Sequence, residues 1–571
     1  MYFRFPFLLL LIVAGLVGII ILKDHLDEGV SAANKAVPVK TPSEETSAVR
    51  EDIPDTHFAA LQSITSSDLR RHVVFLADDV LQGRDTGSRG ARIAALYISS
   101  QFDKFGLRPV GENGSYYQTV YLNEKKISAD SEFKIEIDGE MVPLKYKVDF
   151  LVVTPPNQSG MEVTRDLIFT AFGIQASEYD YDDFKNLDVK GKATIYVSGE
   201  PPSDDEKYFR GNKASQYSNG SAKRRTAKKN GADAAIGVVL PELFEQISWA
   251  GIQNFYTRSK ISLRNDAATE GEDFAAIILH PDAGELLFAG TGRDFADIKK
   301  AAMDGTIQPF EMSKKIQMKL IVENNQIEDS NVAGFLEGSD AELKSEVIVF
   351  TAHYDHVGIG TPVKGDSIYN GAADNASGTS GLMELAEAFS LLPERPKRSM
   401  LFLAVTAEEK GLLGSKFYVK NPIFPLAKTV ANFNLDIIGI GDTTGVVVYG
   451  IERSTLGDMI TKAVQEVGLE IIPDELPEQR IFYRSDHFSF VKQGIPSIMP
   501  GFGIRREWFA NFNKFYHQPS DDANLFYFDF GYMKKSVQAI FLAGLWVANA
   551  EKSPTWTPGD EFEHAREAKQ E

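Results

Sequence analysis

Six residues in the second half of the chain have side chains that can bind metal ions, and their order suggests one kind of chemistry. A histidine is followed by an aspartate, a pair of glutamates, a second aspartate and a second histidine: His353, Asp374, Glu408, Glu409, Asp436 and His517. Histidine and carboxylate ligands in this number can hold two zinc ions bridged by one carboxylate, and they leave one glutamate to act as a base. The set therefore predicts a two-zinc hydrolytic centre.

Each of these residues also has an ordinary structural explanation. A histidine at the end of a strand is often simply hydrogen-bonded, and an aspartate before NASG can cap a turn or a helix. Two adjacent glutamates can form a solvated turn. Together these explanations need several independent coincidences, whereas a metal centre needs a single cause, so the metal hypothesis is preferred.

The segments around these residues alternate between strand-like and helix-like patterns. The runs EVIVFTAH, SMLFLAVTAEE and TVANFNLDII are predicted strands, and NASGTSGLMELAEAFSLL and GLLGSKFYVKN are predicted helices between them. Continuous apolar runs are typical of strands that helices cover on both faces, and such sheets bind ligands just beyond the carboxyl ends of their strands. His353, the Glu408–Glu409 pair and Asp436 stand at or near those ends. The pattern thus predicts an α/β fold that gathers them at one edge.

Composition narrows the class of protein. The chain has 571 residues, of which 43% are hydrophobic and 25% charged, which indicates a globular protein with more than one domain. Its net charge of −20 argues against nucleic acid or an anionic membrane surface as a partner. Because cysteine is absent, disulfides, thiolate zinc sites and thiol nucleophiles are excluded.

The N-terminus predicts export to the periplasm or the extracellular space. Residues 6–22 are an unbroken apolar run that follows Arg4 and precedes the polar stretch KDHLDEG. A run of this kind is either part of a cleaved signal peptide within residues 1–33 or a retained membrane anchor, and both interpretations stay open. Residues 34–56 are rich in Lys, Glu, Ser, Thr and Pro and are predicted to be a polar tether.

The rest of the chain is predicted to hold a split domain with an insertion. The insert, residues 141–320, is β-rich: DLIFTAF, KATIYVSG and AAIGVVL read as strands, and RRTAKKNGADA reads as a helix. None of the six candidate residues lies in it, and its His280 is expected to be a packing or surface residue. The flanking parts of the main domain are residues 57–140 and 321–550, and a polar tail follows at 551–571.

The order and intervals of the six residues resemble the two-zinc aminopeptidase family that includes bacterial leucyl aminopeptidases, glutamate carboxypeptidase II relatives and glutaminyl cyclases. The resemblance extends to GRDTGSRG at 83–90, SDHFSF at 485–490, GIPS at 494–497 and YHQPSDD at 516–522. The segment AFGIQASEYDYDDFKNLDVKGKATIYVSG resembles the protease-associated domain found in many members. The family likeness implies a three-layer αβα mixed sheet of the zinc exopeptidase type with such a domain inserted.

Carried over position by position, the resemblance divides the ligands between two zinc ions. It pairs His353 with Asp436 on one ion and Glu409 with His517 on the other, and it makes Asp374 the bridge between them.

The resemblance leaves Glu408 as the general base, because its neighbour Glu409 is committed to zinc. Asp355, two residues after His353, and Asp521, four residues after His517, are expected to accept the free imidazole N–H groups and so orient the rings.

The resulting hypothesis is an exported zinc-dependent aminopeptidase that hydrolyses the N-terminal residues of peptides. Because both glutamates of the pair are present and no ligand position is vacant, hydrolysis is favoured over the single-zinc cyclisation of some family members. The alternatives are a carboxypeptidase or dipeptidase of the same fold, and a non-catalytic binding protein that retains the fold.

Overall fold

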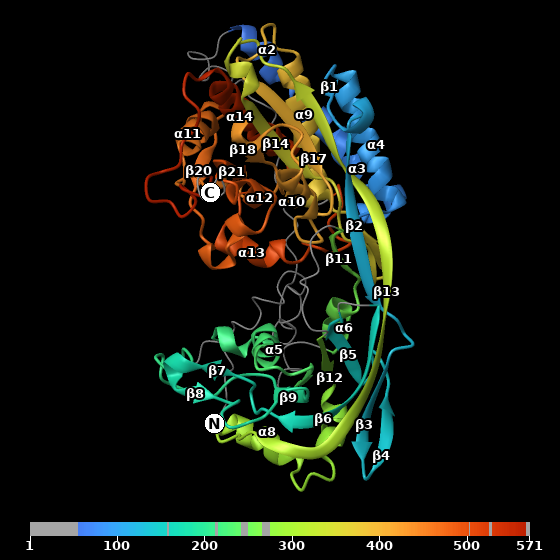
Figure 1. The fold of residues 1–571 in the computed structure, drawn as a ribbon. Helices are drawn as coiled ribbons and strands as arrows, with labels where there is room; N and C mark the ends of the chain where they lie inside the picture. Colours follow the sequence, from blue (N-terminus) through green and yellow to red (C-terminus); the bar gives the residue numbers. More distant parts are fainter. Residues whose placement is uncertain are drawn as a thin grey trace, which may run out of the picture. The chain divides into compact units, whose positions relative to one another are not determined.

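The computed structural model describes residues 55–156, 159–211, 215–240, 249–264, 274–501, 503–524 and 528–566. These residues form two compact units (Figure 1). The inserted unit consists of residues 123–326, and the main unit combines the segments before and after it. The chain passes between the units inside two strands, β2 (Tyr117–Ile127) and β13 (Phe310–Leu336).

The inserted unit contains a mixed sheet, and it is wider at both ends than the insert predicted at 141–320. The extra residues include β3, which pairs with both β4 and β13 and therefore packs with this unit. Parallel pairing links β6 to β9, β9 to β10 and β10 to β12. The strands are β3 (Glu132–Ile137), β4 (Glu140–Leu144), β5 (Phe150–Thr154), β6 (Gly160–Phe169), β9 (Ala193–Val197), β10 (Ala234–Val238) and β12 (Ala275–Leu279).

The main unit is also built on a mixed sheet. Strand β17 pairs in parallel with β14, β14 with β18, and β18 with β21, while β13 adds an antiparallel strand beside β17. At the other side β19 pairs antiparallel with β21 and parallel with β20. The bounds are β14 (Val347–His353), β17 (Ser399–Val405), β18 (Thr429–Asn434), β19 (Gly445–Tyr449), β20 (Glu470–Ile472) and β21 (Ser497–Pro500).

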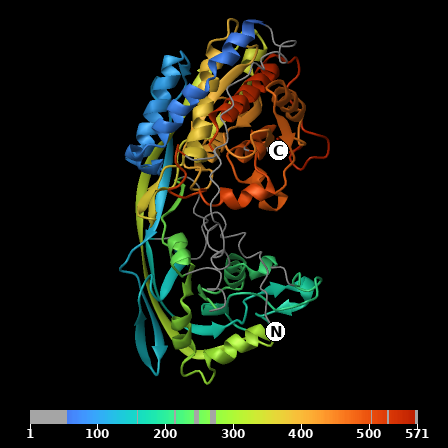
Figure 2. The same ribbon diagram turned by 180° about the vertical axis from the view of Figure 1, so that it is seen from behind.

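Helices cover both faces of this sheet. Alternate residues of β14 enter different cores: Ile348 and Phe350 lie in one, and Val347 and Val349 in the other. The first core is covered by α3 (Ser66–Leu76), α4 (Arg89–Lys104), α9 (Gly378–Ser390) and α14 (Phe530–Asn549), and the second by α10 (Leu413–Lys420) and α12 (His487–Val491) (Figures 1 and 2). Because a strand turns successive side chains to opposite faces, apolar runs in β14 and β17 serve both layers. The predicted three-layer αβα fold is confirmed.

The local predictions around the site agree with the structure in all but one respect. The runs predicted as strands are β14, β17 and β18, and the second predicted helix is α10. The first predicted helix begins only at Gly378, because Ala372–Ser377 forms a separate π-type turn. That turn carries Asp374, which therefore belongs to an irregular segment before the helix.

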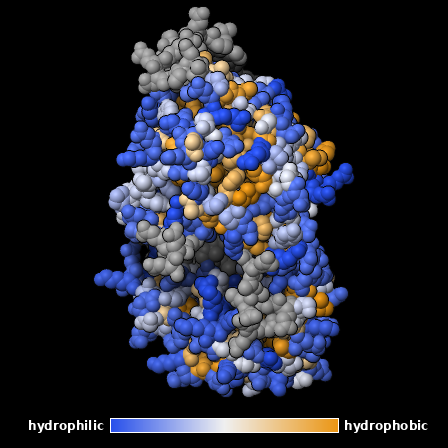
Figure 3. Space-filling model, turned by 45° about the horizontal axis from the view of Figure 1, so that its top comes forward, coloured by the Kyte–Doolittle hydropathy of each residue, from blue (hydrophilic) through white to orange (hydrophobic). Residues whose placement is uncertain are grey.

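No helix among the described residues is long and apolar enough to cross a membrane. The apolar run predicted at 6–22 lies outside the described residues, as does nearly all of the tether predicted at 34–56. The face in Figure 3 is mainly hydrophilic, with hydrophobic residues gathered in a few patches.

A buried lysine holds part of the inserted unit together. Lys223, on α5 (Gly220–Lys229), is 1% exposed, and its ammonium donates to the backbone oxygens of Phe172 (2.6 Å), Gly199 (2.5 Å) and Val197 (3.4 Å). Burial lowers the pKa of Lys223 to about 7, against the nearby charges of Asp183 and Glu200.

Replacing this lysine should destabilise the inserted unit and leave the predicted zinc centre of the main unit intact. The variant Lys223→Met removes the donor for three carbonyls, so it should lower the free energy of unfolding by on the order of 2–4 kcal/mol. Hydrogen exchange of the β9 and β10 amides measures this loss. Exposed Lys229 on the same helix provides the control Lys229→Met. Unchanged exchange in Lys223→Met, or loss of zinc from it, would contradict the expectation.

Candidate metal centre

Three neighbouring strands deliver candidate ligands to one edge of the main sheet. His353 is the last residue of β14, the Glu408–Glu409 pair follows the end of β17 at Val405, and Asp436 lies just beyond the end of β18 at Asn434. Because these strands are parallel and adjacent, their carboxyl ends meet at the same edge. The structure thus brings together residues that are far apart in the sequence.

The first cluster is centred on His353. Its Nε2 atom lies 3.3 Å from Oδ1 of Asp374 and 3.4 Å from Oδ1 of Asp436. His353, Glu408 and Asp436 also form a group whose potential ligand atoms all lie within 4.8 Å of one another. His353 is 1% exposed, whereas Glu408 is half-buried and the side chain of Asp436 is 12% exposed.

The second cluster is centred on His517, in the segment between α13 (Arg506–Phe512) and α14. Its Nε2 atom lies 3.1 Å from Oδ2 of Asp374 and 3.1 Å from Oε1 of Glu409. Asp374 therefore presents one carboxylate oxygen to each cluster, which is the arrangement that a bridging ligand requires.

The hydrogen bonding of these groups suits cations. Neither ring nitrogen of His517 makes a regular hydrogen bond within the described part of the chain, and Oδ1 of Asp436 lacks one as well. Buried polar atoms normally have partners, and an ion shared by several of them would supply one. Imidazole nitrogens and carboxylate oxygens, with no sulfur, are a donor set that zinc accepts.

His356 belongs to the second cluster, although it was not among the residues predicted from the sequence. Its ring is fully buried, Nδ1 lies 2.8 Å from Oε1 of Glu409, and the ring meets that of His517 edge to face, 5.4 Å between centroids. It groups with Asp374, Glu409 and His517 as a potential ligand. The signal was the second histidine of TAHYDH, three residues after His353.

The two aspartates expected to orient the histidines make other contacts. The carboxylate of Asp355 accepts the backbone N–H groups of Glu408 (3.0 Å) and Glu409 (3.4 Å), and the nearest Asp355 atom to Nδ1 of His353 is the backbone oxygen, at 3.2 Å. The carboxylate oxygen of Asp355 is 3.8 Å from that nitrogen.

Asp521 likewise accepts the backbone N–H groups of Ala373 (2.8 Å) and Asp374 (3.0 Å), and no hydrogen bond joins it to His517 among the described residues. The turns that carry the ligands leave backbone donors without secondary-structure partners, and these two buried carboxylates satisfy them. Their hydrogen bonds thus go to ligand-bearing backbone, and of the two only Asp355 keeps an ionic contact with its histidine, at 3.8 Å.

The two glutamates have opposite electrostatic surroundings. Burial raises the pKa of Glu408 well above its ordinary value; the charge of His353 opposes this shift and that of Glu409 adds to it. Burial also acts to raise the pKa of Glu409, but the charge of His517 and a hydrogen bond from His356 hold it well below its ordinary value. Glu409 is thus suited to remain an anionic ligand, and Glu408 to take up a proton.

Two further residues border the centre. The ring of Tyr516 stacks on that of His517 with 4.0 Å between centroids, and burial, reinforced by the charge of Asp374, raises the pKa of its hydroxyl well above the usual 10. Asp486, from the SDHFSF motif, is fully buried, and burial raises its pKa to about 6. The motif is recognisable in the sequence, but its residue types alone predict no chemical role for Asp486.

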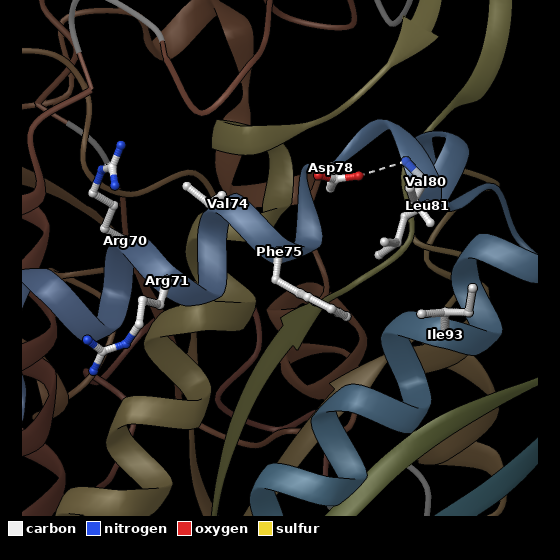
Figure 4. A pocket seen from close by; sticks show the side chains of 8 residues that line it. All are labelled: Arg70, Arg71, Val74, Phe75, Asp78, Val80, Leu81 and Ile93. Carbon is white, nitrogen blue, oxygen red and sulfur yellow. Dashed lines mark hydrogen bonds between the residues drawn. The ribbon is translucent and has the colours of Figure 1, made fainter.

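A separate surface groove lies on α3, the adjoining turn η2 (Asp79–Arg84) and α4 (Figure 4). Asp78, the one carboxylate in its lining, accepts the backbone N–H of Val80 at 2.9 Å. None of the lining residues belongs to either metal-ligand cluster: Arg70, Arg71, Val74, Phe75, Asp78, Val80, Leu81 and Ile93. The groove therefore offers no second metal centre.

Comparison with known proteins agrees with this geometry. The model of "Peptidase family M28" matches residues 331–536, a segment that contains all six candidate residues. The chain carries a peptidase family M28 domain. The match confirms the predicted family, and together with the two ligand clusters it confirms the prediction of a centre for two zinc ions. The proposed resemblance of the inserted unit to a protease-associated domain stays a prediction.

Two curated relatives match the chain over short segments. Aminopeptidase YwaD of Bacillus subtilis is 34% identical over 127 residues, which cover 22% of this chain and 25% of that protein. Leupeptin-inactivating enzyme 1 of Streptomyces exfoliatus is 36% identical over 134 residues, covering 23% and 29% respectively. The matches thus span about a quarter of the length of these two relatives.

A solved structure matches over almost its entire length. An aminopeptidase from Aneurinibacillus sp. strain AM-1 aligns with a TM-score of 0.53 and 19% sequence identity, covering 88% of this chain and 98% of that one. At this identity the likeness establishes the fold, which is the mixed α/β architecture described above.

Proposed function

We propose that this protein is a zinc-dependent aminopeptidase that removes N-terminal residues from peptides. The observation that carries the proposal is the pair of donor clusters that share Asp374, with Glu408 next to the ligand Glu409. In this assignment His353 and Asp436 hold one ion, His517 and Glu409 hold the other, and Asp374 bridges the two.

The protein's own residues would perform the proton transfers. Two bound zinc ions lower the pKa of a water molecule and polarise the scissile carbonyl. Glu408 takes the proton from the attacking water and returns it to the leaving amine, as a general base that becomes a general acid. The carboxylate of Asp355 accepts the backbone N–H of Glu408 at 3.0 Å, which restrains the backbone from which the Glu408 side chain extends.

The centre is rich in carboxylates, a type of group that can bind the ammonium of a free N-terminus. Seven carboxylates lie in or directly behind it, from Asp355, Asp374, Glu408, Glu409, Asp436, Asp486 and Asp521. Burial raises the pKa of Asp486 to about 6 and the pKa values of Asp355 and Asp521 to about 7, so part of this set is protonated near neutral pH. The carboxylates that stay ionised attract a substrate ammonium at short range.

The names of relatives point the same way without deciding the matter. The curated relative from Bacillus subtilis is an aminopeptidase, whereas a Caenorhabditis briggsae protein that is 23% identical over 436 residues is a glutamate carboxypeptidase 2 homolog. A carboxypeptidase or dipeptidase, or a non-catalytic binding protein with this fold, is therefore the alternative to be tested.

Paired substrates separate these functions. Purified protein should carry close to two zinc equivalents and cleave a leucyl peptide with a free N-terminus. It should not cleave the same peptide after N-acetylation, whereas blocking the C-terminus should have little effect. Cleavage that survives N-acetylation but is lost when the C-terminus is blocked would indicate a carboxypeptidase, and loss of cleavage with either block would indicate a dipeptidase. Bound zinc without any cleavage, over a broad set of peptides, would indicate a binding protein.

His356 should tune the metal position held by Glu409 and His517. Its Nδ1 lies 2.8 Å from Oε1 of Glu409, so His356→Ala should weaken zinc at that position by about 10–100-fold, the usual effect of losing such a partner. Chelator competition measures the two dissociation constants separately. The 76% exposed ring of His564 supplies the control His564→Gln. Two unchanged constants in His356→Ala would contradict this role.

We also propose that the protein is exported. The support is the apolar run at residues 6–22 after Arg4. Cell fractionation tests the location, and sequencing the N-terminus of the exported form distinguishes a cleaved signal from a retained anchor. Recovery of the full-length chain in the cytoplasm would contradict export.

A further inference from the structure

The motif GRDTGSRG at 83–90 lies outside the matched M28 region, yet it reaches the metal centre. Its arginine, Arg84, ends the turn η2 and is completely buried. In the sequence the motif precedes the inserted unit, whereas all the candidate ligands follow it.

The guanidinium of Arg84 binds backbone oxygens next to two ligand positions. Nε donates to the oxygen of Tyr354 at 2.8 Å, directly after His353. Nη1 donates to the oxygen of Asn370 at 2.7 Å and Nη2 to that of Gly371 at 2.9 Å, just before the turn that carries Asp374. A further bond from Nη1 reaches the oxygen of Leu76, at the end of α3.

The residues after Arg84 continue the same contact. The hydroxyl of Thr86 donates to the carboxylate of Asp355 at 3.2 Å, and that carboxylate in turn holds the backbone N–H of Glu408. Asp85 forms an ion pair of 2.6 Å with Lys410, the residue after Glu409. The motif thus contacts the loops of three ligand-bearing segments.

The complete burial of the Arg84 guanidinium costs free energy. Burying a guanidinium is unfavourable unless its donors are satisfied, and among the described residues no carboxylate lies within ion-pair distance of Arg84. Its planar fork of N–H donors instead fits several carbonyl oxygens at once, which a lysine ammonium cannot reproduce. A brace of this kind fixes the separation of the two loops it joins.

We propose that Arg84 is a positioning residue that sets the metal affinity of the centre by holding the loops of His353 and Asp374 in place. The inference rests on the proposed zinc function. It also means that the matched M28 segment alone lacks a part of its own metal centre.

A second buried arginine supplies a matched control. Arg398 is 1% exposed and binds the backbone oxygens of Val547 (3.1 Å) and Ala550 (2.5 Å), but it stands just before β17, at the amino end of the strand that carries Glu408 and Glu409 beyond its carboxyl end. Arg398 also forms a 2.7 Å ion pair with Glu346, a contact that has no counterpart at Arg84 among the described residues. Arg84→Met and Arg398→Met therefore each remove a buried arginine that binds backbone oxygens, at opposite edges of the sheet.

The experiment measures zinc affinity by chelator competition in the full-length chain, and thermal unfolding with and without zinc. Both variants should unfold at lower temperature than the wild type. Arg84→Met should in addition bind zinc about 10–100-fold more weakly and show a smaller zinc-induced rise in Tm. Arg398→Met should keep the wild-type zinc affinity and the full rise, and Arg84→Lys should fall between Arg84→Met and the wild type.

Wild-type zinc affinity in folded Arg84→Met would overturn the proposal and leave Arg84 a purely structural residue. If Arg84→Met does not fold, Arg84→Lys decides by the same criterion: weakened zinc supports the brace, and unchanged zinc overturns it. A wild-type chain that binds no zinc would instead overturn the proposed function.

Discussion

Replacement of Glu408 by glutamine should remove most of the turnover on a peptide substrate and leave zinc binding unchanged. The substitution keeps the size of the side chain but removes its basicity, and a positioned general base typically contributes about 10²–10⁴-fold to the rate. Burial raises the pKa of Glu408 well above its ordinary value, which makes it the better proton acceptor of the pair. KM should change little, because the lost interaction is made in the transition state.

The neighbouring glutamate provides the control for this experiment. Glu409 lies 3.1 Å from Nε2 of His517, so Glu409→Gln should release zinc from that position as well as lower the activity. Steady-state kinetics and zinc analysis of the two variants distinguish the roles. Near wild-type turnover in Glu408→Gln would show that another group acts as the base, and exchanged phenotypes would reverse the assignment of the pair.

The sequence was most informative where a ligand follows a regular strand. His353, Glu408 and Asp436 could be placed at one edge because apolar runs identified β14, β17 and β18, and neighbouring parallel strands end together. The same runs predicted the two covered faces, since β14 and β17 have no polar side for water. Hydrophobic periodicity and the order of the strands were therefore sufficient to predict most of the fold.

The direction of side chains in irregular segments could not be predicted from the sequence. Asp355 and Asp521 stand near histidines in the sequence, but their carboxylates turn to backbone N–H groups in the turns that carry Glu408 and Asp374. Which donor such a carboxylate reaches depends on the backbone path of another segment. Sequence spacing contains no information about that path.

Contacts between residues far apart in the sequence could not be predicted either. Arg84 binds the oxygens of Tyr354 and Gly371, more than 250 residues away. Backbone acceptors leave no signature in residue type, so a single sequence could mark GRDTGSRG as a motif without showing what it holds. His356 was also overlooked, because a histidine one turn past a strand end has many ordinary roles.

Asp374 is the residue on which both metal positions depend. Its Oδ1 lies 3.3 Å from Nε2 of His353 and its Oδ2 lies 3.1 Å from Nε2 of His517, so one carboxylate serves both clusters. Each of its oxygens would be a direct ligand, and losing even the outer partners of a ligand typically costs about 10–100-fold in metal affinity. Removing the carboxylate should therefore cost at least that much at each position.

We expect Asp374→Ala to raise both zinc dissociation constants and to leave the protein with less than one zinc equivalent after dialysis. Asp436→Ala is the matched control, because Asp436 contacts only the cluster of His353 and should weaken one ion alone. Chelator competition followed by elemental analysis compares the two variants. If Asp374→Ala weakened only one ion, as Asp436→Ala should, Asp374 would be an ordinary ligand of one position. The shared negative charge could then not be what holds two dications at short distance.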